Sequence, residues 1–142
     1  MKVTTRNRLE GVVSAVKKGA VNDEVAIRLK GGLTVSAIVT GESAENLGLC
    51  PGREVIAMVK GVNVLLARDV EGYVLSSRNM LPGKVAAIKE GQIMASVAVD
   101  LENGDRITSV CTVDSLEDAG IAVGVSVQAA IKAPHVILAA KK

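Results

Sequence analysis

Apolar and polar residues alternate along much of the chain, in short stretches that end at glycines. The alternation is clear in Glu24–Leu29 and again in Leu33–Val39, and the stretch between them contains Gly31 and Gly32. A period of two predicts strands with one buried face, and glycine supplies the positive φ that a tight hairpin turn needs. Leu9–Val16 is mostly apolar and β-branched, so it predicts a strand before this hairpin.

The period changes after the third predicted strand. Thr40–Gly48 is typical of one short helix, with Thr40 as a candidate N-cap, acid in the first turn, and Gly48 at the left-handed position that ends a helix. Alternation returns in Glu54–Lys60, and Val62–Ala67 predicts a last strand. The pattern therefore predicts five strands with one helical turn between the third and the fourth.

The whole pattern occurs twice. LSSRNMLPG at 75–83 repeats VTTRNRLEG at 3–11, and an offset of 72 residues then holds without a gap. About 23 of the 63 pairs between Thr5–Ala67 and Ser77–Ala139 are identical. The second hairpin turn falls at 103–105 and the second helix at Thr112–Gly120. We therefore expect two domains, residues 1–70 and 71–142.

The element order favours an all-β fold, with two tandem small Greek-key barrels of the OB type that each carry one short helix. A copy of about 70 residues buries only a marginal core, so the copies should lean on each other or on further subunits. The chain has no Trp, no Phe and one Tyr, so Val, Ile, Leu and Ala must form the core.

Composition narrows the function classes. Net charge is +2 and the basic residues are dispersed, which gives little attraction for nucleic acid. No apolar run approaches the ~18–20 residues of a membrane span, and the N-terminus has no apolar signal region. Cys50 and Cys111 do not correspond in the repeat, so we expect free, buried thiols. Two Cys and one His offer too few ligands for a bare metal cation, and no catalytic set is visible, so we expect no enzyme.

Several polar residues recur in both copies without an evident turn role. The pairs are Thr4/Ser76, Arg6/Arg78, Asn7/Asn79, Ser43/Ser115 and Lys60/Lys132, and Thr40/Thr112 add hydroxyls beside their capping role. These groups are mostly donors, and Gly61 beside Lys60 allows close approach of a ligand to the backbone. Such a set suits a doubly charged oxyanion that is fully deprotonated. The alternative is that each is a solvated surface residue, or that the asparagines bond a turn.

Four segments in order resemble the molbindin family, which is built from molybdate-binding Mop domains. They are TTRN at 4–7 with SSRN at 76–79, GAVNDEV at 19–25, IVTGESAENLGLCPG at 38–52, and KGVNVLL at 60–66 with KAPHVIL at 132–138. The resemblance covers nearly the whole chain and is strongest to the two-domain form. It implies OB-like domains that bind molybdate or tungstate in the cytoplasm for storage or homeostasis, as a homotrimer, with no other cofactor and no reaction.

The resemblance also implies site residues. One side of the first site type would be Thr4, Arg6, Asn7, Lys60 and Gly61, faced by Thr40 and Ser43 from a neighbouring domain. In the second copy the matching residues are Ser76, Arg78, Asn79, Lys132 and Ala133, faced by Thr112 and Ser115. A second site type would use Ala20, Val21 and Asn22, where the second copy instead has Gln92, Ile93 and Met94.

One alternative function stays open on the fold alone, because OB barrels also bind nucleic acids. Such barrels stack bases on aromatic side chains, and this chain has only Tyr73. We therefore favour oxyanion binding, with no nucleic acid and no membrane as partner. The residues do not separate molybdate from tungstate, since both are tetrahedral dianions of similar size.

Overall fold

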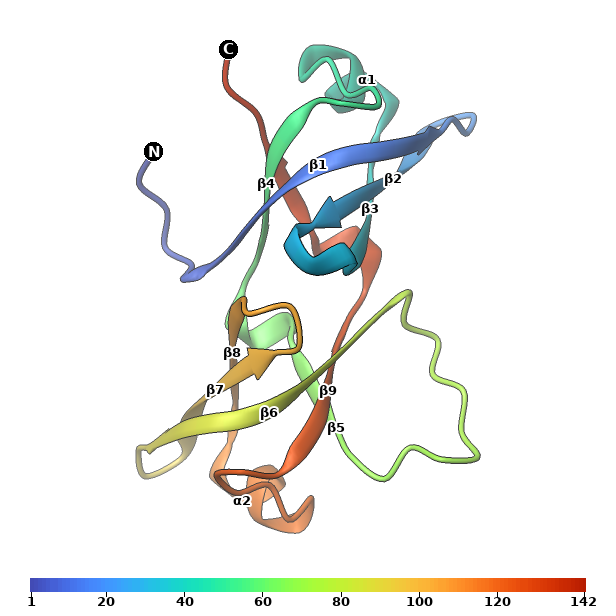
Figure 1. The fold of residues 1–142 in the computed structure, drawn as a ribbon. Helices are drawn as coiled ribbons and strands as arrows, with labels where there is room; N and C mark the ends of the chain where they lie inside the picture. Colours follow the sequence, from blue (N-terminus) through green and yellow to red (C-terminus); the bar gives the residue numbers. More distant parts are fainter.

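A computed structural model describes residues 1–142 and contains two curled five-stranded sheets, one above the other in Figure 1. The first copy forms β1 (Asn7–Lys17), β2 (Asn22–Leu29), η1 (Lys30–Gly32), β3 (Thr34–Thr40), α1 (Gly41–Asn46), β4 (Glu54–Val59), η2 (Gly61–Asn63) and β5 (Leu65–Ala67). The second forms β6 (Asn79–Glu90), β7 (Met94–Leu101), β8 (Arg106–Thr112), α2 (Val113–Asp118), β9 (Ser126–Ile131), η3 (Ala133–His135) and β10 (Ile137–Ala139). The predicted all-β fold of two small OB-like barrels is confirmed.

The predicted periodicities are confirmed in both copies. Val25, Ile27 and Leu29 on β2 are at most 2% exposed, as the alternation requires. Gly31 has a φ of 73° and Gly48 a φ of 61°, so both glycines adopt the left-handed conformations that their positions demanded.

The fifth strand of each sheet comes from the other copy. The first sheet has the order β10-β4-β1-β2-β3, and the second has the order β5-β9-β6-β7-β8. Leu138 on β10 lies opposite Ala57 on β4, and Leu66 on β5 lies opposite Ala129 on β9. The sheets therefore do not follow a division between residues 70 and 71, although the sequence repeat does. An internal repeat cannot reveal this exchange, because the two fifth strands have nearly the same pattern.

A short helical turn redirects the chain at each crossing. The sequence predicts one strand over Val62–Ala67, but η2 occupies Gly61–Asn63 and the strand is only Leu65–Ala67. The prediction was wrong at its start, because these residues turn the chain to pack against β8 of the other sheet. The equivalent turn η3 packs against β3.

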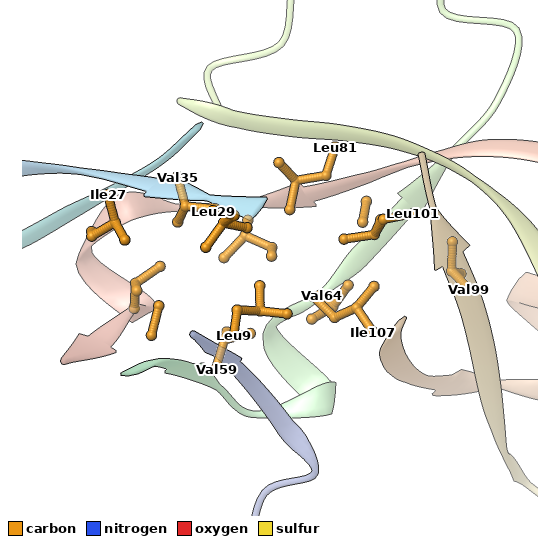
Figure 2. Close-up of a cluster of buried hydrophobic side chains, with 14 of the residues drawn as sticks. Leu9, Ile27, Leu29, Val35, Val59, Val64, Leu81, Val99, Leu101 and Ile107 are labelled. Atoms are coloured by element: carbon orange, nitrogen blue, oxygen red, sulfur yellow. The ribbon is translucent and has the colours of Figure 1, made fainter. Parts of the chain in front are cut away.

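Both copies share one hydrophobic core. A single cluster of 25 buried residues includes side chains of both sheets, and Figure 2 shows Leu9, Leu29 and Val59 of the first copy beside Leu101 and Ile107 of the second. The expectation that the small copies lean on each other is therefore confirmed. The shared core removes more apolar surface from water than two separate cores of this size could.

The hairpin turns of the two copies also meet. Asn103 Nδ2 donates a hydrogen bond to the Lys30 carbonyl oxygen at 3.0 Å, and Lys30 Nζ lies 3.3 Å from Asp105 Oδ1. Both turns lie in the middle of the molecule, whereas α1 and α2 lie at its two ends (Figure 1). This arrangement fixes which polar groups of each copy face the other copy.

Candidate functional site

Arg6 and Lys60 are brought together where β1 and β4 meet the second sheet. Asn7 lies opposite Val59 in the ladder, so the residues just beyond this pair, Arg6 and Lys60, flank the same end. Thr5 Oγ1 donates to the Val59 carbonyl oxygen at 2.7 Å and accepts from the Asn7 N–H at 3.1 Å. These bonds hold the N-terminal segment against β4, so Arg6 and Lys60 occupy facing positions just beyond the end of the ladder.

The charge of this pair is not compensated. Arg6 and Lys60 are exposed, and none of the four ion pairs in the structure includes either of them. Thr4, also exposed, adds a hydroxyl on the same segment. A dianion that reaches this position would meet two cations without a competing carboxylate bound to either.

The side chains of Asn7 and Asn79 have a structural role that the sequence interpretation did not give them. Both are 2% exposed. Asn7 Nδ2 donates to the Thr108 carbonyl oxygen at 2.8 Å, and Asn7 Oδ1 accepts from the Thr108 N–H at 2.7 Å. Asn79 does the same with Ser36. Each amide thus links its own copy to the third strand of the other.

Gly61 also packs against the other sheet. A Cβ at this position would lie 2.8 Å from Val110 Cγ2 and 3.2 Å from the Thr108 carbonyl oxygen, both on β8. Its counterpart Ala133 is 2% exposed. Close packing is therefore sufficient to explain the missing side chain at Gly61, which sequence reasoning attributed to ligand approach.

In the second copy, the corresponding cations have different surroundings. Ser77 Oγ donates to the Ile131 carbonyl oxygen at 3.0 Å, which repeats the bond that Thr5 makes to Val59, so Ser76 and Lys132 occupy positions equivalent to those of Thr4 and Lys60. Arg78, however, donates from Nη2 to Glu24 Oε2 on β2 at 2.9 Å. Sequence reasoning missed Glu24, and the signal available was that its counterpart in the repeat is Ser96 rather than an acid.

The hydroxyls of Thr40 and Thr112 cap the two helices, as predicted. Each Oγ1 accepts from the N–H of the serine three residues on, Ser43 or Ser115, at 3.1 Å. Thr40 Oγ1 also donates to Ser43 Oγ at 2.8 Å, and Ser115 Oγ donates to the Thr112 carbonyl oxygen at 2.9 Å. All four residues stay exposed or half-buried, so the serine oxygens can still accept or donate towards a ligand.

The segment 20–22 lies beside the first of these caps. Asn22 is opposite Thr40 in the β2–β3 ladder, and the Gly41 N–H donates to the Val21 carbonyl oxygen at 2.9 Å. The Val21 side chain is 73% exposed. The structure therefore joins Ala20, Val21 and Asn22 with Thr40 and Ser43 at the start of α1, and α1 lies at the end of the first copy that is far from the second sheet (Figure 1).

A cavity of about 660 Å³ is lined by three of the predicted polar residues of the second copy. Its lining includes Ser76, Lys132 and Ser115, together with His135 and apolar residues of β5 such as Leu65. Arg78 does not line it. Ser115 thus shares a hollow with Lys132 of its own chain, whereas the resemblance placed it opposite, on a neighbouring domain.

Both cysteines are free; Cys50 is exposed rather than buried as predicted, because it lies in the turn after α1, and Cys111 is half-buried. No group of three His, Cys, Asp or Glu side chains is arranged to hold a metal ion. None of the helices has the length and apolar character needed to cross a membrane.

Comparison with known proteins finds one family model and several similar proteins, which agree with one another. The family model of the TOBE domain matches residues 4–66 and again 75–138. The crystal structure of the cytoplasmic molybdate-binding protein ModG with molybdate bound superimposes with a TM-score of 0.96 and 47% identity, over 99% of this chain and 100% of that one.

Relatives of other lengths match as well. The molybdenum-pterin-binding protein MopA of Rhodobacter capsulatus is 41% identical over 98% of this chain but only 52% of its own length, so the chain spans about half of that relative. The molybdenum-pterin-binding protein 3 of Clostridium pasteurianum is 41% identical over 46% of this chain and 97% of its own length. The chain therefore belongs to the TOBE-domain family, as a two-domain protein of the molbindin type.

Proposed function

We propose that this protein binds molybdate or tungstate as a fully deprotonated oxyanion and holds it in reserve in the cytoplasm. The observation that carries the proposal is the exposed pair Arg6 and Lys60, which no carboxylate neutralises. ModG, which matches along its entire length, has molybdate bound in its crystal structure. A tetrahedral dianion needs several charged hydrogen bonds to offset the loss of its hydration, and each contributes about 1.5–3 kcal/mol.

We further propose that the sites are completed between subunits of a homotrimer. Thr40 and Ser43 lie at the start of α1, whereas Arg6 and Lys60 lie where β1 and β4 meet η2, so we propose that another chain supplies the hydroxyls that face these two cations. Exposed apolar side chains support self-association, among them Val62 at 62%, Val21 at 73% and Ile93 at 74%. An axial site would use the segment 20–22.

The proposal includes no catalysed reaction and no nucleic-acid partner. The one aromatic residue, Tyr73, is 77% exposed on the segment between β5 and β6, so no aromatic platform forms on either barrel for stacking bases.

The lack of a carboxylate paired with Arg6 should also affect which oxyanion binds more tightly. Around Arg6, where no carboxylate is paired, a protonated oxyanion would lack a partner for its own O–H, so hydrogenphosphate should bind more weakly than molybdate.

The test is equilibrium dialysis with molybdate on the intact protein and on Arg6→Ala, Lys60→Ala and Lys132→Ala. Each substitution should weaken one class of site by roughly tenfold or more, because a charged hydrogen bond is lost. Lys18→Ala is the control, since Lys18 is an exposed lysine in the turn after β1. Native mass spectrometry with and without molybdate reports the subunit number and the anion count. Unchanged binding in all three site variants, or a monomer that takes up no anion, contradicts the proposal.

A further inference from the structure

The two arginines that open the copies have different electrostatic partners. Arg78 Nη2 lies 2.9 Å from Glu24 Oε2, whereas Arg6 belongs to none of the four ion pairs. The sequence repeat makes these arginines equivalent, 72 residues apart. Glu24 is therefore a feature of one copy that its duplicate lacks.

The surroundings of the two arginines otherwise follow the repeat closely. The residue after each arginine, Asn7 or Asn79, bonds the same backbone pair on the opposite third strand. In the ladder between β1 and β2, Glu24 lies opposite Lys17. In the equivalent ladder between β6 and β7, its counterpart Ser96 lies opposite Lys89. A basic residue thus accompanies both positions, and the carboxylate is the difference between them.

A carboxylate on the arginine opposes anion binding in two ways. It occupies guanidinium N–H groups that an oxyanion would otherwise use, and its negative charge repels a dianion at the same position. The Arg78 side chain is 64% exposed and that of Glu24 is 31% exposed, so the pair is solvated and can open. Solvated pairs are weak, so Glu24 should lower the affinity of the site without abolishing binding.

We propose that Glu24 makes the two classes of oxyanion site unequal, so that the site with Arg6 and Lys60 binds the dianion more tightly than the site with Arg78 and Lys132. This inference rests on the proposed function and adds a residue that sets the affinity of one class. Anion would fill the Arg6 class first, and the Arg78 class would act as a reserve that fills at higher concentration.

The experiment isolates each class in the full-length protein. Arg6→Ala combined with Lys60→Ala removes both cations of the Arg6 class and leaves the Arg78 class. Arg78→Ala combined with Lys132→Ala leaves the Arg6 class, and molybdate affinity is then measured by equilibrium dialysis at low ionic strength. The Arg78 class should be weaker by roughly 1.5-fold to fivefold, the range that a solvated charge interaction of about 0.2–1 kcal/mol produces. Glu24→Ser, the residue that the repeat itself carries, should remove this difference in the variant that lacks Arg6 and Lys60.

Two controls separate a local charge effect from a structural one. Glu54→Ser makes the same change of residue and charge at an exposed position of β4 that pairs with no cation and whose counterpart is Ser126, so it should change neither class. Ser96→Glu should lower the affinity of the Arg6 class in the variant that lacks Arg78 and Lys132. The effect of Glu24 should also shrink as salt rises, because screening acts on solvated charges.

The outcomes distinguish the two proposals. Equal affinities of the classes in the parent, or an unchanged Arg78 class in Glu24→Ser, would overturn the role of Glu24 while leaving oxyanion binding intact. A parent protein that takes up no molybdate at either class would instead overturn the proposed function itself.

Discussion

Asn79 satisfies both backbone polar groups of Ser36, since its Nδ2 donates to the carbonyl oxygen at 2.8 Å and its Oδ1 accepts from the N–H at 2.7 Å. Asn7 makes the same pair of bonds with Thr108, at 2.8 and 2.7 Å. β3 and β8 are edge strands of their sheets, so these side chains take the place of a neighbouring strand at one residue. Two buried amides therefore stabilise the contact between the copies.

Replacing Asn79 by alanine should destabilise the whole protein. The change removes two buried hydrogen bonds and leaves the Ser36 N–H and carbonyl without partners, for an expected loss of about 2–4 kcal/mol. Denaturant unfolding measures this loss. Asn46→Ala is the matched control, since Asn46 is exposed at the end of α1 and should cost under about 1 kcal/mol. Similar losses for both variants would contradict the assigned role of Asn79.

Replacing Gly83 by alanine should push β6 and β7 apart. A Cβ at Gly83 would lie 2.5 Å from the Asp100 carbonyl oxygen and 2.8 Å from Val99 Cγ1, and the first of these is backbone that cannot rotate away. We expect a loss of about 1–3 kcal/mol, the usual cost of overpacking, as a lower midpoint in thermal unfolding. Ser126→Ala, at an exposed position of β9, should leave the midpoint almost unchanged. A Gly83→Ala variant as stable as the parent would show that the two strands adapt freely.

Replacing Thr112 by alanine should weaken α2. The variant loses the Oγ1 that accepts from the Ser115 N–H, and loss of such an N-cap costs about 0.5–2 kcal/mol. Thr112→Ser keeps the hydroxyl and should retain most of this stability, which denaturant unfolding can measure. If serine and alanine destabilise equally, the methyl group of Thr112 matters more than its hydrogen bond.

Asp100 should titrate at unusually low pH. The hydrogen bond from Arg106 Nε, at 2.7 Å, and the charge of that residue hold the pKa of the Asp100 carboxyl below its ordinary value of 3.8. A lowered pKa in the folded state means that the interaction stabilises the fold above the ordinary pKa and is lost as the pH falls through the lowered one. Both side chains are more than half exposed, so the effect on stability should be small.

NMR titration of the Asp100 carboxyl carbon tests this. In Arg106→Gln the pKa of the Asp100 carboxyl should return towards the ordinary value, because the hydrogen bond and the positive charge of Arg106 are both lost. An Asp100 pKa that does not move in the variant would show that Arg106 is not its cause.

The sequence predicted the helices and strands well, but it did not predict that the two sheets exchange their fifth strands. Period-two alternation in Glu24–Leu29 and the cap at Thr40 depend on residues close together in the chain, so both could be found without a structure. The choice of partner for β5 and β10 depends on where a three-residue turn sends the chain. Gly61–Asn63 and Ala133–His135 give no sequence signal that separates a return to the same sheet from a crossing to the other.

The candidate site was predictable in its residue types and less so in its contacts. The repeat identified Arg6 and Lys60, and the structure brings them together. It also singled out Asn7, but the use of that amide depends on Thr108, 101 residues away. The pairing of Arg78 with Glu24 likewise crosses between copies. Comparing each copy with its duplicate could therefore identify Glu24 only as a position at which the two copies differ.

The reciprocal placement of β5 and β10 has a consequence for how the molecule comes apart. A protease cut in the segment between β5 and β6 would break the covalent link yet leave the fragments associated, since each would still supply an edge strand to the other's sheet. A fragment of one copy made alone would carry a fifth strand with no sheet to complete and a sheet with no fifth strand. Two such fragments can satisfy each other, so a half-length chain would be expected to form an intertwined pair rather than a free barrel.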